Sequence, residues 1–266
     1  MSSESTHETI PVRRRSVSLR LPSGEPRLDQ DQEWCEIGTD DGWRRIRFHD
    51  YGDIYRVPGL YETLFYDHLH CCSPSRVVGL LADVLSDFPE TPADLRVLDL
   101  GAGNGMVGEE LRRIGIDATI GADIIPEARA AALRDRPGVY DDYIIGDLML
   151  LRPEQEQRVR RWQPNCLTSV AALGFGDIPA EVFIRACNLV DTPAWLAFNI
   201  KESFLDPRSD PSGLAAPLHR MQEQGLIEMQ AYRRYPHRMS VSGEPLFYVA
   251  MVARKLQPIP LSLARV

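Results

Sequence analysis

The stretch from residue 95 to residue 115, LRVLDLGAGNGMVGEELRRIG, constrains the fold more than any other part of the chain. The apolar run at residues 95–100 predicts a strand buried on both faces, as in a parallel sheet. Glycines follow at once, and they allow a tight turn with positive φ and the close approach of a ligand to the backbone. Val107 and Leu111 then recur at helical spacing, and Gly115 ends the pattern. The stretch therefore predicts a strand, a glycine turn and an amphipathic helix.

One acidic residue in this stretch suggests a more specific interpretation. Asp99 lies inside the apolar strand, two residues before the first glycine, where burial is costly without hydrogen-bond donors. With this acid, DLGAGNG resembles the first motif of the class I S-adenosylmethionine (SAM) dependent methyltransferases. The resemblance implies that the loop backbone packs against the amino-acid part of SAM and that the strand acid orients the site through its hydrogen bonds. The residues that take these roles are Asp99, Gly101, Ala102, Gly103, Asn104 and Gly105.

A dinucleotide-binding motif competes with this interpretation. Residues 103–108 also fit GxGxxG, and Asp123 follows at about the distance of a ribose-binding acid. Both cofactors carry a ribose, so Asp123 does not separate them. SAM is favoured by the offset of Asp99, by a third acid at Asp147, and by the position of the motif about a third of the way into the chain.

Further strands are predicted after the glycine turn, and their pattern indicates the α/β class. The resemblance implies a three-layer α/β sandwich with a seven-stranded, mostly parallel sheet and an antiparallel final pair, in which the last strand is inserted beside the fifth. The strands expected after the first one are residues 118–123, 142–147, 166–173, 194–200, 227–235 and 245–254.

The ends of the second and third strands carry the other cofactor candidates. In the family, the acid that ends the second strand accepts hydrogen bonds from the ribose hydroxyls, which implies this role for Asp123. Ile124 and Ile125 lie where apolar side chains would flank the adenine. Asp147 and Leu148 are candidates for the adenine edge, and the alternative for Asp147 is a cap on the next turn.

Composition and cysteine usage restrict compartment and partners. A chain of 266 residues with 44% hydrophobic content can bury one sizeable core, and its net charge of −8 gives no general attraction to nucleic acid. The five cysteines show no CxxC spacing, so reduced thiols and no metal site are expected. Neither a signal peptide nor a membrane-length apolar run is visible, which predicts a soluble cytoplasmic protein. The oligomeric state is left open, a homodimer included.

The chain ahead of the glycine motif divides into two parts. Residues 1–30 are polar and lack periodicity, which predicts a disordered tail. Residues 31–72 are rich in aromatic residues and a helix is predicted from Ser73, so residues 31–92 are expected to form a cap or lid followed by a helix. The methyltransferase core is then expected at residues 93–257 and a C-terminal tail at residues 258–266. In related methyltransferases the cap often closes over SAM and contributes to the substrate pocket, which makes candidates of Tyr51, Tyr55, Tyr61 and Tyr66.

The loop after the fourth strand, GFGDIP at residues 174–179, is expected beside the methyl group of SAM. It lacks the Asn/Asp-Pro-Pro-aromatic sequence of base N-methyltransferases, and the chain lacks the Pro-Cys nucleophile of cytosine C5 enzymes. These departures argue against nucleic-acid base chemistry. Phe175 and Asp177 are pocket candidates. Lys201 follows the fifth strand, where it either meets an anionic substrate or pairs with Glu202 at the surface.

A general base would help if the methyl acceptor is a hydroxyl or an ammonium group. The histidines considered for this role are His49, His68, His70 and His237, with Asp177 as a carboxylate alternative, and the catalytic candidates retained are His70, Asp177 and His237. The substrate candidates are Tyr55, Tyr61, Tyr66, Phe175 and Lys201.

The resulting hypothesis is a SAM-dependent methyltransferase that transfers a methyl group to a nitrogen, oxygen or carbon atom of a small molecule. The alternatives are an NAD(P)-dependent oxidoreductase and a non-catalytic module that binds SAM and acts through a partner. A peptide or protein acceptor also stays open.

Overall fold

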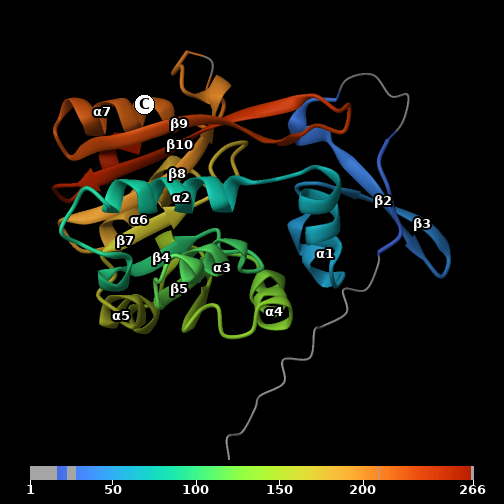
Figure 1. Cartoon of the computed structure of the whole chain (residues 1–266), viewed down its shortest axis with the longest axis horizontal. Helices are drawn as coiled ribbons and strands as arrows, with labels where there is room; N and C mark the ends of the chain where they lie inside the picture. The colour runs from blue at the N-terminus through green and yellow to red at the C-terminus, as the bar shows by residue number, and fades with distance from the viewer. Residues whose placement is uncertain (1–16, 23–27, 209, 265–266) are drawn as a thin grey trace, which may run out of the picture.

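The computed structural model describes residues 17–22, 28–208 and 210–264. In these ranges the chain forms a seven-stranded sheet with helices on both faces, and a three-stranded sheet stands at one end of it beside helix α1 (Tyr51–Arg56), as Figure 1 shows. The predicted α/β sandwich is therefore confirmed.

The large sheet has the strand order β6–β5–β4–β7–β8–β10–β9. Neighbouring strands from β6 to β8 are parallel, whereas β10 is antiparallel to both β8 and β9. The last strand thus lies beside the fifth, as expected. The bounds are β4 Arg96–Leu100, β5 Ala118–Asp123, β6 Asp142–Ile145, β7 Cys166–Ser169, β8 Ala194–Lys201, β9 Ile227–Met239 and β10 Pro245–Lys255.

Alternate residues of the central strands pack into different cores on the two faces of the sheet. On β4, Leu98 belongs to one core and Val97 to the other. Phe198 and Trp195 of β8 divide in the same way. Because both faces are covered, both residue positions must be apolar, and this explains the nearly continuous apolar runs in the sequence.

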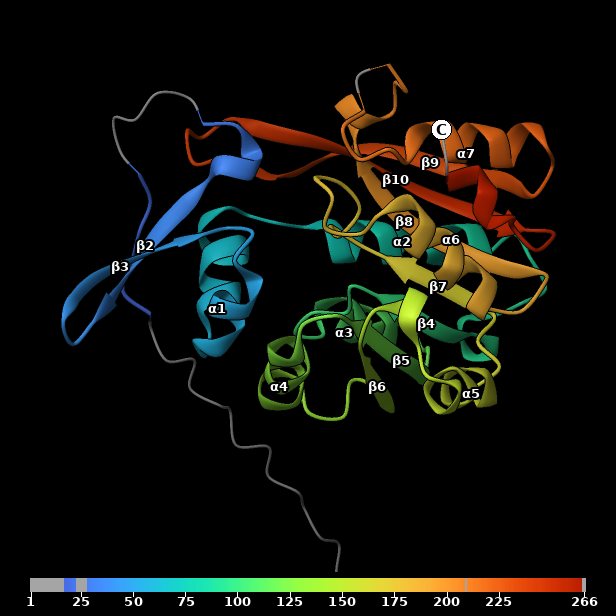
Figure 2. The same cartoon turned by 180° about the vertical axis from the view of Figure 1, so that it is seen from behind.

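Helices cover each face of the large sheet. Helices α2, α3 and α4 lie on the face seen in Figure 1, and α5, α6 and α7 lie on the face seen in Figure 2. Their bounds are α2 Ser73–Leu85, α3 Met106–Arg113, α4 Pro126–Asp135, α5 Pro153–Arg161, α6 Ala180–Leu189 and α7 Ala215–Glu223. The fourth strand of the core, expected at residues 166–173, ends earlier at Ser169, because the chain turns at Ala171 with a φ of +55°.

The N-terminal part of the described chain forms a cap with a small core of its own. Members of this core include Ile37, Ile46, Phe48, Ile54 and Leu64, all buried. The cap consists of α1 and of β1 Leu19–Arg20, β2 Trp34–Thr39, β3 Gly42–Arg47 and a π-helix at Glu62–His68.

The two predicted tails differ from what was expected. Residues 1–16 and 23–27 of the expected disordered tail lie outside the described residues. The prediction is wrong for Leu19, which pairs with Ile37 of β2, because the alternating apolar side chains of residues 17–21 pack against the cap core.

The C-terminal tail expected at residues 258–266 packs onto the body of the protein. Its Ile259 is buried, and the backbone N–H of Ile259 donates to Asn188 Oδ1 of α6 at 2.9 Å. A turn of 3-10 helix follows at Leu261–Ala264. Among the residues that the structure describes, no helix has the length and apolar character needed to cross a membrane.

Candidate active site

A cavity of about 440 Å³ lies at the carboxyl ends of the parallel strands, between the large sheet and the cap. This is where open α/β sheets bind ligands, and pockets of about 300–1,000 Å³ are typical of small-molecule sites. We call it the large cavity. Its lining residues are His49, Tyr51, Tyr55, Tyr61, Leu100, Gly101, Ala122, Asp123, Ile124, Ile125, Gly146, Asp147, Leu148, Val170, Ala171, Ala172, Gly176, Asp177, Ile178, Pro179 and Val182.

Asp123 connects the end of β5 to the glycine loop. Its Oδ2 accepts the backbone N–H of Gly103 at 2.9 Å, and its Oδ1 accepts that of Ile125 at 3.0 Å. Burial raises the pKa of Asp123, although these backbone N–H groups lower it. Ile124 and Ile125 also line the large cavity, as expected for residues beside a bound ring.

The glycine loop approaches other segments so closely that side chains would not fit. Gly101 lines the large cavity with a φ of +74°, and a Cβ there would lie 2.7 Å from Ala172 Cβ. A Cβ on Gly103 would lie 2.5 Å from Tyr55 Oη of the cap. The residues from 102 to 105, which were predicted cofactor contacts, do not line the cavity. The loop passes from Gly101 directly into α3, which begins at Met106.

Asp99 holds the strands together beneath the cavity and does not line it. The carboxylate is fully buried and accepts hydrogen bonds from Thr168 Oγ1 at 2.6 Å and from Tyr140 Oη at 2.5 Å. Burial raises its pKa to about 7, although both hydroxyl donors lower it. The residue thus acts on the site by positioning β4 against β7, in line with the orienting role that the resemblance implied.

Asp147 and Leu148 line the large cavity after β6. Oδ1 of Asp147 accepts the backbone N–H of Met149 at 2.8 Å and so begins the 3-10 turn Leu148–Leu150. The capping role considered from the sequence is therefore observed. It leaves the other carboxylate oxygen of Asp147 for a ligand.

The cap contributes three stacked or tilted tyrosine rings to the large cavity. Ring centroids are 6.2 Å apart for Tyr51 and Tyr55 and 5.3 Å apart for Tyr55 and Tyr61. Tyr66, the fourth candidate, does not line the cavity, because it packs against the cap core and its ring lies 6.2 Å from that of Tyr61.

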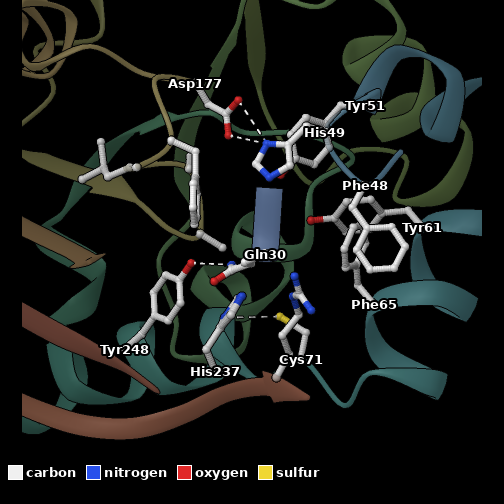
Figure 3. Close-up of a pocket in the computed structure, with 16 residues that line it drawn as sticks. Gln30, Phe48, His49, Tyr51, Tyr61, Phe65, Cys71, Asp177, His237 and Tyr248 are labelled. Carbon is white, nitrogen blue, oxygen red and sulfur yellow. Dashed lines mark hydrogen bonds and ion pairs between the residues drawn. The ribbon is translucent and has the colours of Figure 1, made fainter. Parts of the chain in front are cut away.

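A second cavity of about 40 Å³ adjoins the large one, and Figure 3 shows it. We call it the small cavity. Cap residues, the loop after β7 and the ends of β9 and β10 meet there. It shares His49, Tyr51, Tyr61, Ala171, Ala172 and Asp177 with the large cavity. Its other lining residues are Gln30, Phe48, Phe65, Cys71, Leu173, Gly174, Phe175, His237, Arg238 and Tyr248.

His49 and Asp177 form a pair in the shared wall. Nδ1 of His49 lies 3.0 Å and 3.3 Å from the two carboxylate oxygens of Asp177, as the dashed lines in Figure 3 mark. The sequence placed Asp177 in the pocket and His49 among the histidines considered. It did not indicate the pairing, because 128 positions separate the two residues.

His237 lines the small cavity from the end of β9, which runs four residues beyond the predicted strand. Its Nδ1 lies 2.6 Å from Ser73 Oγ, which in turn contacts Tyr235 Oη at 2.6 Å. Asn199 Nδ2 donates to both hydroxyl oxygens. Burial, and secondarily the charge of Arg238, hold the pKa of His237 well below its usual value, so the ring is neutral.

The remaining candidates differ in their distance from the cavities. Phe175 lines the small cavity with a φ of +51°. Lys201 lines neither cavity, and its Nζ lies 5.0 Å from the centroid of the Phe175 ring, where burial lowers the pKa of the ammonium group. His70 is exposed and lines neither cavity, although its neighbour Cys71 lines the small one, and we do not retain it as a catalytic candidate.

Several lining residues of the small cavity were not predicted. Gln30 comes from a segment interpreted as tail, Tyr248 from a predicted strand, and Arg238 from the connection expected between the last two strands. The alternation of Tyr235 and His237 was a usable signal for the side on which His237 lies. Alternation would place Arg238 on the other side, and the register shift between Leu246 and Phe247 of β10 breaks it there. No sequence pattern near Gln30 indicated its place in the cavity.

The strand order and the glycine loop define the class to which this structure belongs. An inner run of five parallel strands followed by an antiparallel last strand inserted beside the fifth is the fold of class I SAM-dependent methyltransferases, as predicted. Counted with β4 as strand 1, the sheet of this protein has the order 3-2-1-4-5-7-6. A dinucleotide-binding sheet has the order 3-2-1-4-5-6 and lacks the inserted last strand.

Comparison with known proteins gives particular relatives within this fold. No family model matches the chain. A ubiquinone biosynthesis O-methyltransferase from Roseobacter denitrificans is 33% identical over 99 residues, which are 34% of this chain and 39% of the relative. The match thus spans well under half of the relative's length.

Solved structures are similar to this chain at low sequence identity. A SAM-dependent methyltransferase from Anabaena variabilis has a TM-score of 0.52 and 14% identity, with 79% of this chain and 96% of that chain covered. The magnesium protoporphyrin IX methyltransferase of Synechocystis, solved with S-adenosylhomocysteine (SAH), has a TM-score of 0.46 and 14% identity over 68% of this chain and 82% of that chain.

Proposed function

We propose that the protein is a SAM-dependent methyltransferase that acts on a small molecule. The observation that carries the proposal is the large cavity, around which Gly101, Asp123 and Asp147 are grouped at the carboxyl ends of three neighbouring strands. The Roseobacter relative, whose name describes an O-methyltransferase, supports the same class of reaction.

The lining residues fit the parts of SAM. The carboxylate of Asp123 has acceptor capacity left beyond its two backbone donors and would take the ribose hydroxyls. Ile124 and Ile125 would flank the adenine, and Asp147 with Leu148 would meet its edge. When bound, SAM supplies an electrophilic methyl group, and the protein contributes alignment of the acceptor and exclusion of water.

The small cavity favours an enzyme over a module that only binds SAM. It adjoins the large cavity through a shared wall of six residues, and it contains polar groups from separate elements of the fold. A binding module that acts through a protein partner needs no such enclosed second space.

Calorimetric titration of the purified protein with SAH, and in parallel with NADH, tests the proposal. We expect micromolar binding of SAH and no binding of NADH. Binding of NADH alone would show that the GxGxxG pattern is the one that matters and that the protein is an oxidoreductase. Labelled SAM then allows a screen for acceptors.

A further inference from the structure

The pair of His49 and Asp177 lies where a methyl acceptor would meet the cofactor. Both residues line the large cavity and the small one, so they stand in the wall between the two spaces. His49 comes from the loop between β3 and α1, and Asp177 from the loop after β7. The pair therefore joins the cap to the body at the boundary between cofactor and acceptor.

The hydrogen bond of the pair fixes the tautomer of the imidazole. The carboxylate of Asp177 can only accept, so the N–H at Nδ1 of His49 donates to it, and the ring's free lone pair is on Nε2. Nε2 has no hydrogen-bond partner within the described chain. In Figure 3 the unpaired ring nitrogen of His49 points away from Asp177 and toward the middle of the cavity. A carboxylate that orients a histidine in this way is the usual arrangement for a general base.

The buried network behind His237 supplies a donor on the opposite side of the small cavity. If each hydroxyl proton is used once, Tyr235 donates to Ser73 and Ser73 donates to Nδ1 of His237. The neutral ring then carries its proton on Nε2, which has no partner among the residues described. His49 thus offers an acceptor and His237 a donor.

The rings around the small cavity favour an acceptor with an aromatic body. Arg238 lines the cavity, and Lys201 lies 5.0 Å from the centroid of the Phe175 ring. Arg238 is paired with the buried carboxylate of Glu33, so its charge is compensated, and Lys201 lines neither cavity. The preference for a hydroxyl acceptor rests instead on the pair of His49 and Asp177, because a hydroxyl has a proton for a general base to take. Rings from both sides form most of the apolar wall, namely those of Phe48, Tyr51, Tyr61, Phe65, Phe175 and Tyr248.

We propose that His49, oriented by Asp177, is the general base that takes the proton of an aromatic hydroxyl, and that a phenol is therefore the methyl acceptor. This inference rests on the proposed function. The phenol oxygen uses its own electron pair to bond to the methyl carbon, the carbon–sulfur bond breaks with its pair on sulfur, and the hydroxyl proton goes to Nε2 of His49. Solvent then removes that proton from the imidazole.

The size of the small cavity sets a condition on this step. About 40 Å³ holds the reacting hydroxyl or a water, and a whole phenol ring needs more space. The ring of the acceptor therefore displaces aromatic side chains of the cap, of which Phe48 and Phe65 are in edge contact at 5.5 Å.

A structural role for the pair makes a different prediction. If His49 and Asp177 only fasten the cap to the loop after β7, their removal loosens the cap and leaves the ionisation of a bound phenol unchanged. A probe whose ionisation is visible separates the two roles. Such a probe is 4-nitrophenol, because its phenolate absorbs visible light and the neutral phenol does not.

The experiment titrates 4-nitrophenol into the protein saturated with SAH, at a pH below the pKa of the free probe. We expect the phenolate band to appear on binding to the wild type. His49→Gln and Asp177→Asn should weaken binding of the phenolate by about ten- to a hundredfold, since each removes a charge-assisted hydrogen bond or its orientation. The control is His219→Gln, an exposed histidine on α7, which should behave as the wild type.

The outcomes separate this proposal from the proposed function. SAH affinity, measured on the same samples, reports the cofactor site, and its absence from the wild type overturns the proposed function. If SAH binds and no phenolate band appears, or if the band persists at full strength in His49→Gln and Asp177→Asn, His49 is not the base. Retained SAH affinity in each variant shows that the variant folds.

Discussion

If the proposed function holds, the carboxylate of Asp123 contacts the ribose of the cofactor. Replacing it by alanine removes the expected bonds to the ribose hydroxyls, and we expect SAH binding to weaken by about 1–3 kcal/mol. Calorimetry on Asp123→Ala measures this. Asp117→Ala is the matched control, because the Asp117 side chain is 89% exposed and lies outside the cavity. Unchanged affinity in Asp123→Ala would remove the residue from the site.

Asp99 makes stability depend on pH in an unusual direction. Burial raises its pKa from 3.8 to about 7, so between these values the unfolded chain releases the proton while the folded protein keeps it. The free energy of unfolding therefore falls as pH rises through this window. Asp99→Asn has no carboxyl group to titrate at this position, so this fall in the free energy of unfolding with rising pH is absent from the variant. Its amide can still accept from Thr168, while Tyr140 Oη already lies 3.3 Å from the carbonyl oxygen of Ala102.

We therefore expect the free energy of unfolding of Asp99→Asn, relative to that of the wild type, to rise by about 2–4 kcal/mol between pH 4 and pH 7.5. Urea denaturation of both proteins across that range measures the difference. A difference that stays flat with pH would show that Asp99 is ionised in the folded protein.

At the scale of elements, a buried ion pair fastens the π-helix of the cap to the end of α4. Arg136 donates to Glu62 Oε1 at 2.7 Å, and both side chains are at most 10% exposed. Arg136→Ala leaves the Glu62 carboxylate buried with only the amide of Asn104 as a donor, so we expect a loss of about 3–5 kcal/mol.

The control for this change is Arg56→Ala. Arg56 of α1 pairs with Glu127 of the same helix α4, but at the surface, with 60% of the Arg56 side chain exposed. Exposed pairs contribute little, so thermal unfolding should change much less than in Arg136→Ala. Equal losses in the two variants would mean that the contact between cap and α4, and not the buried charge, determines stability.

The elements also show which parts of the structure were predictable from the sequence. Strands β4 and β5 follow from nearly continuous apolar runs, with an acid inside the first and at the end of the second, because such runs are needed wherever a strand is covered on both faces. The sequence did not predict β1, because a strand of two residues is too short to show an alternating pattern of apolar and polar residues. The His49–Asp177 pair was missed for another reason. Only the crossing of the cap over the sheet brings residues so distant in sequence together, and no local spacing encodes that crossing.

On the scale of the whole molecule, side chains of both the cap and the large sheet line the large cavity. The cap contributes Tyr51, Tyr55 and Tyr61, and the sheet contributes Gly101 and Asp123. A ligand that contacts both the cap and the sheet stabilises the closed arrangement over an open one. The stabilisation equals the difference between the ligand's binding free energies for the two arrangements. Bound SAH should therefore hold the cap on the sheet as well as stabilise the protein against unfolding.

Amide hydrogen exchange with and without SAH measures this coupling. We expect slower exchange at residues 49–68, which include the three tyrosines, and no change at residues 38–43, where β2 and β3 join and most side chains are exposed. Protection at both segments would mean that SAH only raises global stability. Protection confined to the glycine loop and β5 would mean that the cofactor binds without the cap, and the cap would then serve the acceptor alone.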